Sequence, residues 1–268
     1  MKSILKYEAY KFDKGSVAKV TDPLTVESPL QININNSPFS VVMQTPGKEK
    51  ELVAGLLFAE DVIKDFDQVD WEFKHNKNEV IEIVNLKTSE NNLADGYKSV
   101  RSLLSVSSCG ICGKREIEDL TPFQSKLKGK LNISFKEIFQ LQKGLKAKQK
   151  IFDQTGGLHG VALFGKELNL LCIHEDIGRH NALDKCVGSL VLNKSLNQAS
   201  FMAFSGRISY EIVSKAFRAK IGLISAVSAP SSLAVDFAKE FGITLVGFTR
   251  DDKGTCYSNP QRITDLIE

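Results

Sequence analysis

The sequence is poor in cysteine and has no long apolar run. Its 268 residues include five cysteines, an odd number, and only Cys109 and Cys112 stand close together. This usage argues against a disulfide framework and for a reducing compartment. No apolar run approaches the roughly 18–20 residues of a membrane span, and Lys6 and Glu8 interrupt the first apolar residues, unlike the core of a signal peptide. We therefore expect a cytoplasmic protein with no membrane partner.

Charge of one sign is not in large excess either. The formal net charge is +3, hydrophobic residues make up 42% and charged residues 25% of the chain, as in ordinary globular proteins. An arginine-rich run with interleaved aromatic residues is absent, so we expect no nucleic-acid partner. Basic residues outnumber acidic ones between Lys114 and Lys150, which fits either a solvated helix face or a site for an anionic ligand.

Hydrophobic periodicity in the first hundred residues predicts a mixed α+β region. Apolar and polar residues alternate in two pairs of short segments, which is typical of half-buried strands. A helix is expected from Lys48, because Leu52 and Leu56 share one face. The predicted strands cover residues 29–35, 38–44, 69–75 and 79–85, and a polar loop is expected at 87–99.

The pattern changes after residue 150, where apolar segments alternate with amphipathic ones. This predicts an α/β sheet that is at least partly parallel. We divide the chain into an α+β region at 1–105, a flexible loop at 106–133 and an α/β core at 134–268. The helices of the core are expected at 135–150, 178–192, 208–220 and 231–241, and its strands at 158–164, 169–174, 199–205, 222–227 and 243–249.

Two cysteines stand in a glycine-flanked loop, Cys109-Gly110-Ile111-Cys112-Gly113. Thiols at this spacing form a disulfide, bind a soft metal or hold a persulfide beside a second thiol. A structural zinc needs four ligands, and no second pair follows. The other cysteines fall in a predicted strand, helix and strand, where a lone cysteine is usually a small buried apolar residue; they are Cys172, Cys186 and Cys256. We therefore favour a thiol reagent on a loop and expect no metal site.

Three polar junctions lead from a predicted strand into a predicted helix. They cover residues 174–181, 205–209 and 225–232. Loops at the carboxyl ends of strands in open α/β sheets are common ligand sites, so we expect the junctions to converge on one pocket. Helix N-termini there suit a phosphate group, and Arg207 adds positive charge. Simple capped turns are the alternative, and Asp176 is expected to cap the helix that follows it.

Several segments together resemble the FdhD family, the sulfurtransferases that serve formate dehydrogenase. The cysteine loop is one, and Glu175-Asp176-Ile177-Gly178-Arg179-His180-Asn181-Ala182-Leu183-Asp184-Lys185 is the most specific. The others are Thr45-Pro46-Gly47, Thr155-Gly156-Gly157-Leu158-His159, Ser205-Gly206-Arg207, Ser228-Ala229-Pro230 and Gly247-Phe248-Thr249-Arg250. The resemblance runs from about residue 25 to the C-terminus. It implies a cytidine-deaminase-like three-layer α/β core, with the smaller α+β region before it, and a homodimer.

The resemblance also implies an activity. Sulfur is taken as a persulfide from a cysteine desulfurase and passed to the molybdenum cofactor of the formate dehydrogenase catalytic subunit, in its bis-molybdopterin guanine dinucleotide form. A guanine nucleotide such as GDP is expected to occupy the same site. Cys109 resembles the family's persulfide cysteine and Cys112 its companion. The residues that we expect at the cofactor are His174, Glu175, Asp176, Arg179, His180, Asn181, Ser205, Gly206, Arg207, Lys215, Ser228, Phe248, Thr249, Arg250, Asp251, Asp252 and Lys253.

Two other functions stay open on the sequence alone. A carrier or insertion chaperone would hold the guanine dinucleotide cofactor without transferring sulfur, with the cysteines as a redox clamp. A zinc-dependent deaminase would need His and Cys ligands with a glutamate acid/base, and the sequence has no such set.

Overall fold

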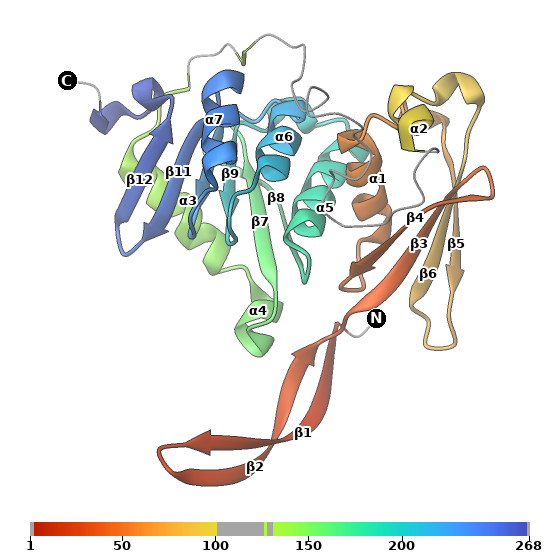
Figure 1. Cartoon of the computed structure of the whole chain (residues 1–268), viewed down its shortest axis with the longest axis horizontal. Coiled ribbons are helices and arrows are strands. Elements are labelled where there is room, and N and C mark those ends of the chain that lie inside the picture. Colours follow the sequence, from red (N-terminus) through yellow and green to blue (C-terminus); the bar gives the residue numbers. More distant parts are fainter. Residues whose placement is uncertain (1–2, 101–125, 128–130, 267–268) are drawn as a thin grey trace.

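The computed structural model describes residues 3–100, 126–127 and 131–266 (Figure 1). A six-stranded sheet forms its centre, in the order β12-β11-β10-β9-β7-β8. β9, β10 and β11 run parallel, whereas β7 is antiparallel to both of its neighbours and β12 is antiparallel to β11. The alternating α/β pattern and its partly parallel sheet are thus confirmed. The strands are β7 (His159–Phe164), β8 (Leu170–Asp176), β9 (Phe201–Phe204), β10 (Leu223–Ala226), β11 (Thr244–Arg250) and β12 (Lys253–Ser258).

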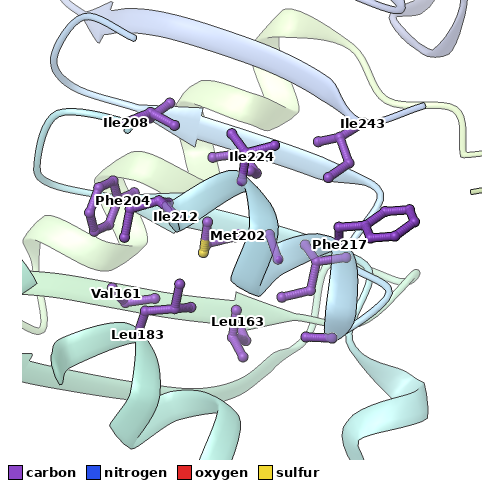
Figure 2. Close-up of a cluster of buried hydrophobic side chains, with 14 of the residues drawn as sticks. Val161, Leu163, Leu183, Met202, Phe204, Ile208, Ile212, Phe217, Ile224 and Ile243 are labelled. Atoms are coloured by element: carbon purple, nitrogen blue, oxygen red, sulfur yellow. The ribbon is translucent and has the colours of Figure 1, made fainter. Parts of the chain in front are cut away.

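Helices cover both faces of this sheet (Figure 1). Three lie on one face, and α3 lies on the other. Alternate residues of one strand serve the two faces: Val161 and Leu163 of β7 pack under the three helices (Figure 2), whereas Ala162 packs toward α3. Burial on both faces explains why these strands are continuous apolar runs. The helices are α3 (Phe135–Lys146), α5 (Arg179–Leu192), α6 (Tyr210–Arg218) and α7 (Ser232–Phe241).

A second, four-stranded sheet precedes the centre in the chain, in the order β4-β3-β6-β5. Every second residue of β3 is buried, from Leu30 to Ile34, and packs with Leu52 and Leu57 of α1. Because side chains of a strand alternate between its two faces, these residues all lie on the side of the sheet that packs against α1. The elements are β3 (Ser28–Ile34), β4 (Ser37–Gln44), α1 (Glu49–Ala59), β5 (Asp70–His75) and β6 (Ile81–Lys87).

The two sheets are joined where α1 crosses α5, and two glycines make the crossing close. A Cβ on Gly55 would lie 1.9 Å from the carbonyl oxygen of Asp184, and one on Gly188 would lie 1.8 Å from that of Glu51. Only hydrogen fits at either position. This contact places β4, and the Thr45-Pro46-Gly47 turn after it, against the end of β8.

A two-stranded arm projects from the molecule (Figure 1). It consists of β1 (Ile4–Asp13) and β2 (Ser16–Thr25), which pair over ten residues each. Lys14 and Gly15 both have positive φ, as a tight two-residue hairpin turn requires. Tyr10 and Phe12 near the tip are 76% and 72% exposed. The sequence pattern does not predict this arm, because its two faces are both largely exposed and mix apolar with charged residues.

Two expectations for the elements were wrong. The helix expected at 135–150 ends at Lys146, and a separate helix, α4 (Lys150–Thr155), follows after a turn. The Glu175 carboxylate of β8 accepts hydrogen bonds from the backbone N–H groups of Ile151 and Phe152, so a distant residue fixes this new start. The loop expected at 87–99 contains the short helix α2 (Asp95–Val100).

Short single-turn helices complete the connections. None of the helices in the described ranges is long and apolar enough to cross a membrane. The single turns cover Phe66–Gln68, Glu90–Asn92, Leu196–Gln198, Pro260–Arg262 and Thr264–Leu266.

Candidate functional site

Two adjoining hollows open beyond the ends of β9, β10 and β11. The larger has a volume of about 850 Å³ and the smaller about 630 Å³. Val227, Arg250 and Asp251 line both, so the two hollows adjoin in one depression. Its position, at the carboxyl ends of neighbouring parallel strands, is where ligands bind in open α/β sheets.

The larger hollow has aromatic walls, with buried polar residues among those that line it. Phe139 of α3 and Phe152 of α4 contribute aromatic walls. Three buried polar residues also line it: Gln142, Gln149 and Thr249 are 6%, 3% and 4% exposed. Each has one side-chain atom without a hydrogen-bond partner among the described residues, namely Gln142 Oε1, Gln149 Nε2 and Thr249 Oγ1. A few buried polar groups in an apolar cavity are typical of small-molecule sites.

The smaller hollow is rich in positive charge. Arg207, Arg250 and Lys253 line it. Guanidinium and ammonium groups are the side chains that bind phosphate groups. Phe248 on its wall has a φ of 56°, a conformation that is rare for a bulky residue and clusters at functional sites.

The structure brings most of the predicted cofactor residues of the later junctions to these hollows. The 205–209 and 225–232 junctions do converge, together with the turn between β11 and β12. Cofactor binding by these residues stays a prediction. The larger hollow has Ser205, Thr249 and Asp252, the smaller has Arg207, Ser228, Phe248 and Lys253, and both share Arg250 and Asp251.

Gly206 of the same junction packs closely against the core of the site. A Cβ there would lie 3.2 Å from His159 Nδ1, and His159 lines the larger hollow. Burial lowers the pKa of His159, and the nearby charges of Arg179 and Arg207 lower it further. His159 is therefore neutral at pH 7, and the two guanidinium groups form a positive field around it.

The earlier junction, residues 174–181, does not line these two hollows, and its Asp176 and Asn181 side chains are engaged within the protein. Asp176 Oδ2 lies 2.7 Å from Lys185 Nζ and accepts a hydrogen bond of 3.1 Å from the Thr45 N–H. Lys185 Nζ donates to the Thr45 carbonyl oxygen at 2.8 Å. Asn181 Nδ2 donates to Asp176 Oδ1 at 3.0 Å and to the Met43 carbonyl oxygen at 2.7 Å. These bonds fasten β4 and the turn after it to the core.

The expectation that Asp176 caps α5 was wrong. The helix begins after Gly178, which has no side-chain cap. Asp176 Oδ1 instead accepts from the Gly178 N–H at 2.8 Å, and its other oxygen holds the N-terminal sheet. In the sequence, Asp176 stands just before the helix, where a capping residue is expected. In the structure its carboxylate pairs instead with the buried Lys185, which lies further along α5.

His174 and Glu175 line a third hollow of about 280 Å³, beside Lys48 and Lys185. Burial, with the charge of Lys48, lowers the pKa of His174 from 6.5 to about 4. The ring is therefore neutral, and its Nε2 lies 2.8 Å from Ser189 Oγ. Glu175 anchors the start of α4, as described above. Their expected contact with a cofactor stays a prediction.

The remaining predicted residues are Arg179, His180 and Lys215. Arg179 is the first residue of α5, and its buried Nε has no partner among the described residues. His180 Nε2 lies 3.4 Å from Ser209 Oγ, which links two junctions. Lys215 Nζ lies 2.7 Å from Asp184 Oδ1, and the two side chains are 10% and 2% exposed. Lys215 thus has an internal anionic partner, and its cofactor contact stays a prediction.

The cysteines divide into two groups. Cys109 and Cys112 lie outside the described residues, so their expected role is unchanged. Cys172, Cys186 and Cys256 lie in a strand, a helix and a strand, as predicted. Burial raises the pKa of the Cys186 and Cys256 thiols, which keeps them protonated and poorly nucleophilic. In the described part of the chain, no three His, Cys, Asp or Glu side chains gather as a metal site.

Sequence reasoning missed Gln142 and Gln149. A signal for Gln142 was present, because it follows Ile138 by four residues and precedes Leu145 by three, on the apolar face of α3. A polar residue on a buried face needs a partner or a ligand. No comparable signal marks Gln149, whose burial depends on the turn between α3 and α4.

Known proteins match this chain along nearly its whole length. A protein of Saccharolobus solfataricus named sulfur carrier protein FdhD is 38% identical over 264 residues, covering 97% of this chain and 98% of the relative. One of the same name from Streptomyces avermitilis is 38% identical over 271 residues, covering 93% and 92%. A crystal structure from Desulfotalea psychrophila, described as a "putative formate dehydrogenase accessory protein", shares the fold: the TM-score is 0.76 at 24% identity, over 98% of this chain and 100% of that one. The model of the FdhD/NarQ family matches residues 25–264, and the chain belongs to that family.

Proposed function

We propose that this protein is a cytoplasmic sulfurtransferase for formate dehydrogenase maturation. It accepts persulfide sulfur from a cysteine desulfurase and transfers it to the bis-molybdopterin guanine dinucleotide form of the molybdenum cofactor. One observation carries the proposal: the depression at the strand ends joins a basic hollow to a larger one with aromatic walls. That combination suits a large ligand with phosphate groups and heterocyclic rings. The sulfur chemistry is proposed because the relatives are named sulfur carrier proteins.

The sulfur steps use the two cysteines of the loop. A thiolate at Cys109 attacks the outer sulfur of the donor's persulfide; a new S–S bond forms on Cys109, and the donor's cysteine leaves as a thiolate. The thiolate of Cys112 then attacks the Cys109 sulfur. Sulfide leaves for the cofactor, the two cysteines become a disulfide, and a cellular dithiol reduces it for the next cycle. The cysteine pair supplies the two electrons that convert sulfane sulfur to sulfide.

The depression holds the acceptor in this scheme. Arg207, Arg250 and Lys253 bind the phosphate groups, and the larger hollow takes a ring system. A carrier would hold the cofactor in the same depression, so the geometry alone does not distinguish the two functions. The cysteines distinguish them, because only sulfur transfer requires their thiols as carriers of sulfur. We also assign the layered core to the cytidine-deaminase-like class. This is supported by the mixed sheet, which α5, α6 and α7 cover on one face and α3 covers on the other.

The proposed homodimer uses the arm. A two-stranded hairpin alone is marginal in water, and this one exposes Tyr7, Tyr10 and Phe12. Ten residues per strand give a ribbon about 33 Å long. Two arms, each laid with one face on the other copy, would bury on the order of 1,300 Å², the size of a stable interface. A second copy of this chain is therefore the occupant that we assign to the arm.

Complementation tests the proposed function. Cells that lack their own copy of the protein receive wild-type chain or the variants Cys109→Ala, Cys112→Ala and Cys256→Ala, and formate dehydrogenase activity is measured. We expect activity with wild type and Cys256→Ala, and its loss with either loop variant. Full activity with both loop variants would exclude sulfur transfer by the loop and favour the carrier function.

A further inference from the structure

We propose that the third hollow, of about 280 Å³, binds a small tetrahedral oxyanion of the phosphate or sulfate class. The hollow lies where the turn after β4 meets β8 and α5, and no residue that lines it also lines either hollow at the strand ends. Organic ligands usually occupy roughly 300–1,000 Å³, so the size of this hollow favours a small ion. Such a site is separate from the cofactor depression and does not depend on the proposed function.

Three lysines from separate elements line the hollow. Lys48 directly precedes α1, Lys148 lies in the turn between α3 and α4, and Lys185 lies within α5. Ammonium groups bind phosphate and sulfate groups because each donates hydrogen bonds and carries a full positive charge. The N-terminus of α1, which begins at Glu49, adds the positive end of the helix dipole beside Lys48. This arrangement is suited to an anion with more than one negative charge.

Lys148 is the lysine that lacks a counter-ion. Its side chain forms no ion pair and no hydrogen bond with any residue that the structure describes. The preceding lysines of the same segment are paired, Lys143 with Asp252 and Lys146 with Asp153. An exposed lysine without a partner is ordinary, but this one lines a hollow together with two further lysines. A bound anion would supply its missing partner.

Lys185 brings a buried ammonium group to the same hollow. Its side chain is 2% exposed; Nζ lies 2.7 Å from Asp176 Oδ2 and donates to the Thr45 carbonyl oxygen at 2.8 Å. An ammonium group has three N–H groups, and no described residue accepts from the third. Lys185 therefore retains one N–H group for a ligand of the hollow that it lines.

The carboxylates near the hollow are already engaged. Glu175 lines it, and its two oxygens accept hydrogen bonds from the first backbone N–H groups of α4. Asp176 and Glu51 lie beside it, and each pairs with one of the lining lysines. Glu49 accepts from the Gly47 N–H at 2.7 Å. These acceptors are therefore occupied by protein donors, whereas Lys148 has none to pair with among the described residues.

The ring of His174 indicates the sign of the potential inside the hollow that it lines. Burial lowers its pKa most, and the charge of Lys48 lowers it further. Glu51 opposes Lys48 with a smaller effect, and Lys185 acts in the same direction as Lys48. Nearby charges thus disfavour a cation at the ring. The same positive potential favours an anion beside it.

Isothermal titration calorimetry of the full-length protein tests the proposal, with sodium sulfate and sodium phosphate as probes and sodium chloride keeping the ionic strength constant. We expect dissociation constants in the millimolar range or below. The double variant Lys48→Gln with Lys148→Gln should bind at least about tenfold more weakly, because two charged hydrogen-bond donors are lost. Lys136→Gln is the matched control, since it changes an exposed lysine of α3 that lines none of the three hollows; we expect no change.

A second measurement locates the ion, because the basic hollow at the strand ends also suits a phosphate group. The protein has four histidines, so the ring signals of His174 are assigned in NMR spectra with the His174→Gln variant. Sulfate should shift these signals and raise the pKa of His174 from about 4. It should do so equally in Lys253→Gln, in which the basic hollow has lost a charge. In the Lys48→Gln, Lys148→Gln double variant the signals should move much less.

Three outcomes would overturn the proposal. The first is the absence of sulfate and phosphate binding, and the second is an unchanged affinity in the double variant, whose melting curve shows whether it is folded. The third is a His174 ring that does not respond to sulfate while Lys253→Gln abolishes binding, which would place the ion in the basic hollow alone. Glycerol phosphate identifies the source of the oxyanion: binding as tight as that of phosphate indicates a phosphate ester, and weaker binding indicates the free ion. Both of these results support the site.

Discussion

Lys185 and Asp176 form a buried ion pair where the two sheets of the protein meet. Nζ lies 2.7 Å from Oδ2, and the side chains are 2% and 0% exposed. Both groups also bond to Thr45, one to its carbonyl oxygen and one to its N–H. The pair therefore holds the turn after β4 against the start of α5. Both residues belong to the family-like segment 175–185, so part of that segment stabilises the fold.

Removing one partner of this pair should be costly. Lys185→Met leaves a carboxylate buried without its counter-ion, and we expect the free energy of unfolding to fall by about 3–5 kcal/mol. The double variant Lys185→Met with Asp176→Leu should be more stable than Lys185→Met alone, because the uncompensated charge is gone. Urea denaturation of the variants measures this. A loss below about 1 kcal/mol in Lys185→Met would contradict this role of the pair.

The crossing of α1 and α5 predicts the effect of single methyl groups. Gly188→Ala places a Cβ 1.8 Å from the Glu51 carbonyl oxygen, so the helices must separate; we expect a loss of stability of about 3 kcal/mol or more. Gly144→Ala is the control: it lies in α3 with its nearest atom 4.0 Å from the added Cβ, and alanine should stabilise that helix by about 0.5–1 kcal/mol. Thermal melts of the two variants should shift in opposite directions.

His174 should make the stability depend on pH. Its pKa is about 4 in the folded protein against 6.5 ordinarily. The unfolded chain therefore binds a proton first as the pH falls, and the stability that neutral His174 provides, present above 6.5, is lost progressively toward 4. We expect a loss on the order of 2 kcal/mol, allowing for partial exposure.

Denaturation curves at neutral and mildly acidic pH, for wild type and His174→Gln, isolate this effect. Glutamine retains a polar group for Ser189 but takes up no proton. Wild type should lose more stability than the variant over the same pH interval. Parallel pH profiles would show that His174 is not responsible.

The arm should set the oligomeric state. Replacing Tyr10 and Phe12 by serine removes apolar surface that is 76% and 72% exposed in the single chain. We expect wild type to elute as a dimer in light-scattering chromatography and the double variant as a monomer. Leu233→Ser, on a 43% exposed position of α7, is the control and should stay dimeric. A monomeric wild type, or a double variant that remains dimeric, would contradict the assignment.

Much of the core could be predicted from sequence because its signals are local. The strands that became β7, β9, β10 and β11 are short apolar runs buried on both faces, and the helices between them show one apolar side. The end of α3 and the start of α4 could not be predicted. The pattern of apolar residues continues through them, and the break depends on the distant Glu175 carboxylate.

The site was predicted in part for a similar reason. Polar residues after apolar strands indicated Ser205, Arg207 and Ser228, and the strand ends brought them to one depression. The distinction between residues that face a hollow and residues that bond internally is a property of tertiary contacts. Asp176 and Asp184 both lie in the segment, residues 175–185, that resembles the family most specifically. Their carboxylates nevertheless pair inside the protein, Asp176 with Lys185 and Asp184 with Lys215.

Mass spectrometry of the loop peptide tests most directly whether the cysteine loop carries sulfur. Full-length protein is incubated with a cysteine desulfurase and cysteine, and the persulfide is trapped by alkylation. We predict the mass of one added sulfur atom on the peptide containing Cys109 and Cys112, and no such addition on Cys256 or in Cys109→Ala. An unmodified loop peptide after a productive desulfurase reaction, or equal labelling of Cys109→Ala, would contradict the account.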